Sequence, residues 1–331
     1  MNIKPLVSIT LSAYNVEQYI ARSLDCIINQ SLKNIEIICI DDGSKDKTLS
    51  ILNTYAAKDK RIIVVAKPKN EGLAVARNQA LAMAKGKYIT FVDGDDLFDL
   101  TMLEKAHNLA ENEKSDLVLW DYAIFYNNTD LEINKNKQTS LKPNIATDKV
   151  ALLKRPAFTW TKLIKTETAK QLNIHFPKGL TRQDIPVHWH LITAIEKIAI
   201  LPERLSFYRQ QEQATTAGTD KRLFDLVTVM DITKEYLIKN KLYEAYKDTF
   251  LESQINFFAG MYDKINEGLK PKALKLINER FKKEQLTYLN SGKPLRNQTR
   301  LFFNAKNGSV IAKIKLSLRH FTRYIYRKLK S

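Results

Sequence analysis

An acidic motif, Asp93-Gly94-Asp95-Asp96, directly follows the apolar segment KYITFV. Three carboxylates this close repel one another, and a hard divalent cation is the partner that most readily neutralises them. Mg²⁺ and Mn²⁺ prefer oxygen ligands, and proteins usually bind them through one or two carboxylates together with substrate phosphates. The motif therefore predicts a cation site, and the alternative is a solvated acidic turn.

A second acidic motif, Asp41-Asp42-Gly43-Ser44, follows the apolar segment IEIICI. Ligands of open α/β sheets bind beyond the carboxyl ends of the strands, where a carboxylate can accept a hydrogen bond from a base N–H. An ordinary Asp-Gly turn before a helix is the alternative. Arg77, in a later helical segment, could contact a phosphate or brace the acidic loop. Its alternative is an exposed helical arginine.

Asp184 lies in the segment QDIP, immediately before a predicted helix. A carboxylate within hydrogen-bond reach of a hydroxyl group can remove its proton as a general base. The alternative is that Asp184 caps the helix that follows it.

The elements that must position these residues alternate through the first 120 residues. Short apolar segments at 7–11, 35–40, 61–66, 87–92 and, more weakly, 116–120 predict buried parallel strands. Helices are expected at 17–29, 46–58, 73–85 and 101–113. This alternation predicts an α/β fold with a mostly parallel sheet and helices on both faces. Both acidic motifs should then lie at the ligand-binding edge of that sheet.

The rest of the chain has a different character. Its 331 residues suggest two domains, and the apolar pattern turns helical from Lys221 to about Phe281. No stretch reaches the ~18 apolar residues of a membrane span, and the N-terminus lacks a secretory signal pattern. Cys26 and Cys39 have neither metal-ligand spacing nor a disulfide framework, so we expect two reduced thiols in a cytoplasmic protein.

The positive charge is concentrated at the C-terminus. The net charge is +17, and no acidic residue follows Glu284. Residues 310–330 form a basic amphipathic helix pattern, which predicts contact with an anionic membrane surface. The alternatives are a terminal helix packed on its own domain and a nucleic-acid-binding tail. We expect no nucleic-acid partner, because the first domain concentrates acid at its strand ends.

Six motifs in order are more specific than any one of them. The segments VSITLSAYN, IEIICIDDGS, NEGLAVARNQAL, GKYITFVDGDD, KGLTRQDIP and LSFYR resemble the family 2 glycosyltransferases, and the match runs from Val7 to Arg209. The resemblance implies a GT-A (Rossmann-like) catalytic domain over residues 1–215. Residues 216–331 would form a helical C-terminal extension.

The resemblance also implies roles on the donor side. The nucleotide-sugar pocket would comprise Ser12, Ala13, Tyr14, Asp41, Asp42, Arg77, Asp93 and Gly94. Tyr14 would stack on the base, Asp42 would bind uracil with Asp41 supporting its loop, and Arg77 would lie near the diphosphate. Asp95 and Asp93 would form the D-x-D motif that binds Mn²⁺ or Mg²⁺, with Asp95 the closer ligand.

On the acceptor side, Asp184 would be the catalytic base, with Trp160, Lys162 and Gln183 as candidates for acceptor contacts. Two positions depart from the family pattern, because Ser12 replaces a common proline and Gln183 replaces a common glutamate. The Q-x-x-R-W motif of processive synthases is missing, so one sugar should be transferred per binding event.

These expectations combine into one hypothesis. The chain would be an inverting, metal-dependent, non-processive glycosyltransferase that moves a hexose-type sugar from a UDP-sugar to a hydroxyl of a glycan or lipid-linked acceptor. It would act in lipopolysaccharide, capsule or exopolysaccharide synthesis, at the inner face of the cytoplasmic membrane. The alternatives are a sugar-nucleotide-binding protein without turnover and a basic nucleic-acid-binding protein.

Overall fold

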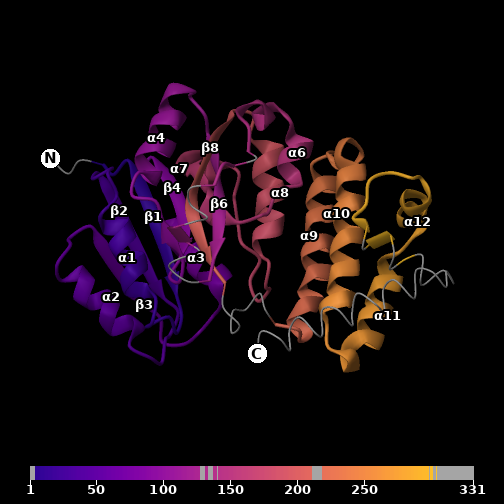
Figure 1. Ribbon diagram of the computed structural model, residues 1–331, viewed down its shortest axis with the longest axis horizontal. Coiled ribbons are helices and arrows are strands. Elements are labelled where there is room, and N and C mark those ends of the chain that lie inside the picture. Colours follow the sequence, from indigo (N-terminus) through magenta and orange to yellow (C-terminus); the bar gives the residue numbers. More distant parts are fainter. Residues whose placement is uncertain are drawn as a thin grey trace. The chain divides into compact units, whose positions relative to one another are not determined.

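The computed structural model describes residues 4–126, 131–132, 137–139, 141–210, 218–297, 299–300 and 303. The chain divides into two compact units, Met1–Ala217 and Gly218–Ser331 (Figure 1). The predicted basic helix at 310–330 lies outside the described residues. Within the described ranges, no helix combines the length and the apolar character needed to cross a membrane.

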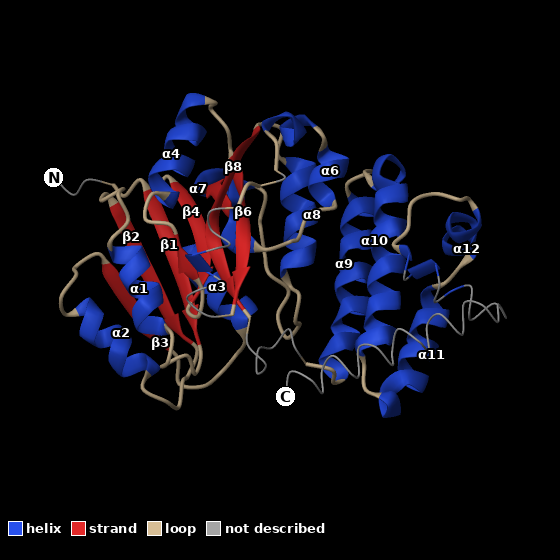
Figure 2. Ribbon diagram, viewed as in Figure 1, coloured by secondary structure: helices blue, strands red, loops and turns tan. Residues whose placement is uncertain are grey.

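An eight-stranded sheet is the centre of the first unit as far as the structure describes it (Figure 2). The spatial order of the strands is β3-β2-β1-β4-β7-β6-β8-β5. In chain order they are β1 (Val7–Ala13), β2 (Ile35–Asp41), β3 (Ile62–Ala66), β4 (Tyr88–Asp93), β5 (Leu97–Phe98), β6 (Leu117–Phe125), β7 (Lys162–Lys165) and β8 (Ile198–Arg209).

The first half of the sheet, β3-β2-β1-β4, is entirely parallel. Every residue of β1 and of β2 is buried, which explains why these strands read as continuous β-branched and apolar runs rather than as alternating patterns. The predicted strands are confirmed, and β1, β2 and β4 each extend one or two residues further toward the acidic motifs.

The second half of the sheet is mixed. Strand β7 is antiparallel to both β4 and β6, β8 is parallel to β6, and the short β5 is antiparallel to β8. The carboxyl ends of β6 and β8 therefore point to the same edge as those of the first half, and so does the start of β7. The prediction of a mostly parallel α/β sheet is confirmed, with β5 and β7 as its reversed strands.

Helices cover both faces of the sheet. They are α1 (Ile20–Ile28), α2 (Thr48–Ala56), α3 (Leu73–Met83), α4 (Met102–Asn112), α6 (Lys149–Leu153), α7 (Thr166–Gln171) and α8 (Asp184–Ala194), with 3₁₀ turns η1 (Pro143–Thr147) and η2 (Thr159–Thr161). Helices α1, α2 and α4 share one apolar core with Val7, Ile9 and Leu11 of β1. Helix α3 contacts β1 and β2, and no described residue of it belongs to that core, as expected for the opposite face.

The second unit is helical, as the sequence predicts. It contains the 3₁₀ turns η4 (Lys221–Phe224) and η5 (Glu267–Leu269) and the helices α9 (Asp225–Lys239), α10 (Tyr243–Lys264), α11 (Lys270–Arg280) and α12 (Lys283–Asn290). Buried Met230, Phe258 and Ile277 come from three different helices and illustrate the core of this unit. A buried hydrogen bond of 2.9 Å from Gln285 to Gln254 joins α12 to α10.

Candidate functional site

The site begins where β1 ends between its two neighbours. Ser12 lies opposite Asp93 of β4, and Ala13 lies opposite Asp41 of β2. The carboxyl ends of these parallel strands therefore bring the two acidic motifs to the two sides of one short stretch of backbone. Tyr14 follows β1 directly and is 44% exposed, so its ring is available to a ligand at this edge.

The Asp42 carboxylate accepts from three donors, and a fourth hydrogen bond fixes its backbone. Its backbone N–H donates to the carbonyl of Ala13 at 2.9 Å. Its Oδ1 accepts from Lys67 Nζ at 2.7 Å and from the Glu71 N–H at 3.1 Å, and its Oδ2 accepts from the Gly72 N–H at 2.8 Å. Asp42 and Lys67 are both buried, so the structure stabilises Asp42 as a fixed acceptor.

Lys67 remains charged in this environment. Burial alone would lower the pKa of Lys67, but hydrogen bonds to Asp42 and Glu71 outweigh that effect and raise it above its ordinary value. The Nζ of Lys67 lies 2.7 Å from Oε2 of Glu71, whose side chain is 43% exposed.

The loop after β2 closes against the backbone that follows β3. Gly43 has a φ of 75°, and a Cβ at this position would lie 2.5 Å from the carbonyl carbon of Lys69. Only glycine combines that backbone conformation with so close an approach. Asp41 is 1% exposed, and its Oδ2 accepts from the Ser44 N–H at 3.2 Å. These contacts support the loop that carries Asp42.

Arg77 joins α3 to the end of β4. Its Nη2 donates to both carboxylate oxygens of Asp93, at 2.9 and 3.2 Å, and its side chain is 4% exposed. Its guanidinium carbon lies 5.6 Å from the ring centre of Phe176. The structure thus shows Arg77 bracing the acidic loop, and its buried side chain excludes an exposed helical arginine; contact with a phosphate stays a prediction.

Hydrogen bonds to its backbone groups fix the loop from Asp93 to Asp96. The hydroxyl of Ser23 donates to the carbonyls of Gly94 and Asp96, at 3.0 and 2.5 Å. The Gly94 N–H donates to the carbonyl of Ser12 at 3.2 Å, and a Cβ on Gly94 would lie 2.9 Å from a methyl carbon of Ile20. These contacts fix the backbone of this motif.

The Asp93–Asp96 loop holds its carboxylates in different environments. Asp96 is 1% exposed, and burial, with the charges of Asp95 and Asp93, raises its pKa well above its ordinary value. Asp93 already pairs with Arg77. The described residues contain no group of three acidic, histidine or cysteine side chains that could enclose a metal ion. Asp95 adds a further carboxylate to the loop after β4, and a Mg²⁺ or Mn²⁺ ion bound there would take its other ligands from substrate phosphates and water.

The turn η2 and the start of β7 carry two of the predicted acceptor-side residues, Trp160 and Lys162. Trp160 is 3% exposed, and its ring is stacked on Phe158 with centroids 4.5 Å apart. Lys162 is fully buried, and its ammonium donates to the carbonyls of Ala157, at 3.3 Å, and Phe158. Both predicted acceptor contacts are thus buried side chains in this structure.

Lys162 is electrostatically coupled to the rest of the site. Burial lowers the pKa of Lys162 to about 7, the negative charge of Asp184 partly offsets that effect, and the charges of Arg155 and Arg77 add to it. The pKa of Lys162 therefore depends on the charges of both Arg77 and the predicted base Asp184.

Asp184 and Gln183 lie at the beginning of α8. Asp184 is the first residue of the helix and is half-buried, whereas Gln183 precedes it and is 3% exposed. No side-chain hydrogen bond caps this helix within the described structure, so the helix-capping alternative for Asp184 is wrong. The Gln183 Oε1 is buried without a hydrogen-bond partner among the described residues.

A pair of hydrogen bonds anchors the chain that leads to α8. Asn78 of α3 donates to the carbonyl of Phe176 at 2.8 Å and accepts from the Phe176 N–H at 2.9 Å. Phe176 also contacts Arg77, so the segment before Asp184 is attached to the same helix that braces Asp93.

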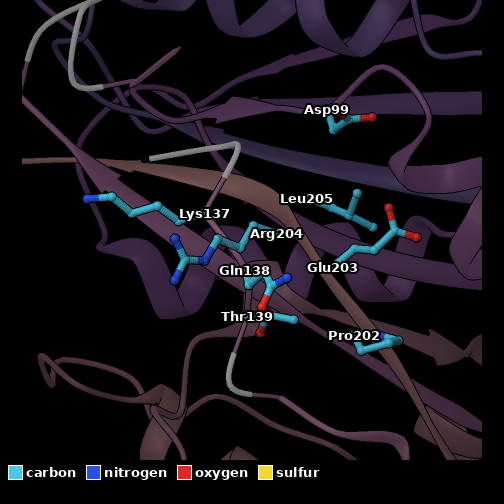
Figure 3. A pocket seen from close by; sticks show the side chains of 8 residues that line it. All are labelled: Asp99, Lys137, Gln138, Thr139, Pro202, Glu203, Arg204 and Leu205. Carbon is cyan, nitrogen blue, oxygen red and sulfur yellow. The ribbon is translucent and has the colours of Figure 1, made fainter. Parts of the chain in front are cut away.

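A pocket of about 440 Å³ lies elsewhere in the first unit (Figure 3). It is lined by Asp99, Lys137, Gln138, Thr139, Pro202, Glu203, Arg204 and Leu205. None of the predicted site residues lines it.

Three residues at the site were not predicted from the sequence: Lys67, Asp96 as a buried group, and Arg209. Lys67 follows the end of β3, and Arg209 is the last residue of β8. A basic residue at a strand end was the sequence signal that could have identified both. Arg209 has a 9% exposed fraction, and its contacts to the Asp93–Asp96 loop become visible only when β8 is placed in the sheet.

Comparison with known proteins supports the sequence resemblance. The model of the family described as "Glycosyl transferase family 2" matches residues 8–175. The chain is 30% identical to the uncharacterized glycosyltransferase EpsJ of Bacillus subtilis over 258 residues, which covers 73% of this chain and 71% of EpsJ.

Solved structures show the same fold. TarS 1-349 of S. aureus in complex with UDP-GlcNAc has a TM-score of 0.56 and 18% sequence identity, with 86% of this chain and 92% of that chain covered. The mannosyltransferase PcManGT of Pyrobaculum calidifontis, in complex with GDP-Man and Mn²⁺, has a TM-score of 0.54 and 15% identity, with coverage of 97% and 85%. At these identities the likeness establishes the GT-A fold alone.

Proposed function

The chain belongs to glycosyl transferase family 2, and from this premise we propose that it transfers a hexose-type sugar from a UDP-sugar to an acceptor hydroxyl, with inversion at the anomeric carbon. One observation carries the proposal. Asp42, Asp93 and Asp95 lie at one sheet edge, and Arg77 braces that edge and acts electrostatically, together with Asp184, on the same buried lysine.

The donor nucleotide is proposed to occupy the edge formed by β1, β2 and β4. Asp42 would accept from the uracil N–H, because its carboxylate is fixed by Lys67 and two backbone donors. The exposed ring of Tyr14 would stack on the base, and Ser12 and Ala13 would provide the adjoining backbone. The UDP-GlcNAc complex of the TarS structure supports uracil, and the GDP-Man complex of PcManGT makes guanine the alternative.

The diphosphate is proposed to lie beside the Asp93–Asp96 loop. Asp95 would hold Mn²⁺ or Mg²⁺, which when bound supplies positive charge that stabilises the departing diphosphate. Arg77 would contribute a second positive charge while it keeps Asp93 in place. The Mn²⁺ in the PcManGT complex supports this assignment.

Asp184 is proposed to accept the proton of the acceptor hydroxyl. As the hydroxyl oxygen bonds to the anomeric carbon, the bond from that carbon to the β-phosphate oxygen breaks, and UDP leaves with the electron pair. A single displacement from the opposite face inverts the configuration. Gln183, with its buried Oε1, and the buried Trp160 and Lys162 would support the region that receives the acceptor.

The acceptor is proposed to be a glycan or a lipid-linked glycan of surface polysaccharide synthesis. Residues 1–215 would be the catalytic domain, and the basic residues 310–330 would hold the protein at the anionic inner face of the cytoplasmic membrane. Co-sedimentation with anionic liposomes, lost on truncation after residue 303, tests the membrane part. Unchanged co-sedimentation of the truncated chain would contradict it.

The donor assignment is tested by measuring nucleotide release from UDP-, GDP- and dTDP-sugars in the presence of Mn²⁺. We expect UDP release from one UDP-sugar, which EDTA and Asp95→Ala should each abolish. Release that persists in Asp95→Ala would contradict the role of Asp95. Tight UDP-sugar binding without release, even with added lipid-linked acceptors, would instead identify a binding protein without turnover.

A further inference from the structure

We propose that Arg209 is a positioning residue that fixes the backbone of the Asp93–Asp96 loop, so that Asp95 is presented to the divalent cation. The inference rests on the proposed function, in which Asp95 holds that cation. It assigns a role to the last residue of β8, more than a hundred positions away in sequence from the loop that it contacts.

Arg209 contacts two consecutive residues of the loop. Its side-chain Nε–H donates to the carbonyl of Asp95 at 2.8 Å, and its backbone N–H donates to Oδ1 of Asp96 at 2.9 Å. One contact therefore holds the main chain of the proposed ligand, and the other satisfies the buried carboxylate that follows it.

The guanidinium itself packs against two aromatic rings. Its central carbon lies 4.8 Å from the ring centre of Tyr19 and 4.5 Å from that of Phe125. A planar cation that packs against two aromatic rings and donates from Nε to a carbonyl has little rotational freedom. Tyr19 directly precedes α1, and Phe125 is the last residue of β6, so residues beside three elements meet at Arg209.

Together with Ser23, Arg209 immobilises three successive carbonyl groups. Ser23 holds the carbonyls of Gly94 and Asp96, and Arg209 holds the carbonyl of Asp95 between them. Because the main chain of Asp95 is already fixed, binding a cation through its side chain costs little further backbone entropy. Outer groups that orient a metal ligand typically contribute about 10- to 100-fold to metal affinity or activity.

Lysine cannot replace Arg209 in this arrangement. A lysine ammonium keeps the positive charge, but it lacks both the planar face that stacks between two rings and the Nε–H set back from the tip of the side chain. Arg209→Lys therefore separates the geometric role from charge alone. Tyr19→Leu is the milder second variant, because it removes one ring and leaves every hydrogen bond of Arg209 in place.

Arg61→Lys is the matched control. Arg61 also donates to a backbone carbonyl, that of Ile28 at 2.8 Å, and pairs with Asp59. It precedes β3, at the sheet edge opposite to the site. The same chemical change is thus made at the other end of the same sheet.

The experiment measures UDP affinity by calorimetry with and without Mn²⁺, and Mn²⁺ binding in the presence of UDP by electron paramagnetic resonance. We expect Mn²⁺ to strengthen UDP binding to the wild-type chain. Arg209→Lys should reduce that enhancement about 10-fold, and Tyr19→Leu should reduce it less. Metal-free UDP affinity should remain within about two-fold, and Arg61→Lys should match the wild type.

Two results would overturn the inference. If Arg209→Lys and Tyr19→Leu, folded by circular dichroism, keep the full Mn²⁺ enhancement, Arg209 does not position the loop, although the proposed function stands. If the wild-type chain itself shows no Mn²⁺ enhancement, the cation role of Asp95 fails and the inference fails with it. Equal losses with and without Mn²⁺ in both variants would identify a purely structural role and would also overturn it.

Discussion

Two buried lysines mark the difference between the two halves of the sheet. On the donor side, Lys67 lies between the carboxylates of Asp42 and Glu71, at 2.7 Å from each, and its pKa is raised. On the acceptor side, Lys162 donates only to backbone carbonyls, and burial lowers its pKa to about 7. The buried charge of Lys67 is therefore compensated by two close ion pairs, whereas Lys162 is a buried cation whose charge depends on pH.

Close partners hold Asp42 and Asp93 in place at the edge proposed to bind the nucleotide. The negative charge of Asp184 raises the pKa of the buried Lys162, so the charge state of Lys162 depends on that of the predicted base. The following experiments test this contrast, in order of decreasing expected effect.

Replacing Lys67 with methionine should produce the largest loss of stability. The variant leaves Asp42 buried without its cation, and removal of one partner from a buried pair costs about 3–5 kcal/mol of unfolding free energy. Lys105→Met is the control, because Lys105 and Glu203 form an ion pair with side chains 41% and 42% exposed, which should contribute less than about 1 kcal/mol. Chemical denaturation measures both. Equal losses in the two variants would remove the contrast between close buried pairs and surface pairs.

The second test compares two glycines with the same φ of 75°, Gly43 on the donor side and Gly179 on the acceptor side. Gly43→Ala should lower the unfolding free energy by about 2–5 kcal/mol. The new Cβ would clash with the backbone of Lys69, and alanine would also have to adopt the left-handed conformation. Gly179→Ala should cost only about 1–2 kcal/mol, since nothing lies within 4 Å of its Cβ. If denaturation shows Gly179→Ala to be the more costly change, the close packing of the donor loop is wrong.

The third test uses pH. The Lys162 pKa falls from 10.5 in the unfolded chain to about 7 in the folded protein. Between these values the unfolded chain binds one more proton, so the contribution of Lys162 to stability rises with pH. That contribution is constant below pH 7 and above pH 10.5.

Relative to Lys162→Met, the wild-type chain should therefore gain about 2–3 kcal/mol of unfolding free energy between pH 7 and pH 9. Denaturation of both chains across this range measures the difference and cancels the other titrating groups. A difference that does not change with pH would show that Lys162 keeps its charge throughout.

The two halves also differ in how far the sequence predicts them. In the donor half, each acidic motif directly follows an apolar strand, so local order along the chain already places Asp41, Asp42 and Asp93 at one edge. In the acceptor half, β7 has four residues and runs against its neighbours, and no local pattern states its direction. The burial of Lys162 could not be predicted, because a lysine is ordinarily exposed.

The contacts of Lys67 and Arg209 could not be predicted for a related reason. Lys67 meets Asp42 across 25 positions, and Arg209 meets Asp96 across 113 positions. Such pairs depend on strand order and register, which a single sequence does not specify. The role of Asp184 as base, in contrast, was suggested by the motif, and the structure adds that its side chain caps no helix.

The central claim is that the donor edge and the start of α8 perform separate tasks, binding and proton removal. The most direct measurement determines UDP affinity with Mn²⁺ and turnover on a UDP-sugar for Asp184→Asn and Asp95→Asn in parallel. Asp184→Asn should bind UDP within about two-fold of the wild type while kcat falls about 10²- to 10⁴-fold. Asp95→Asn should lose the Mn²⁺-dependent part of UDP affinity. Equal weakening of UDP binding in both variants, or wild-type turnover in Asp184→Asn, would contradict the account.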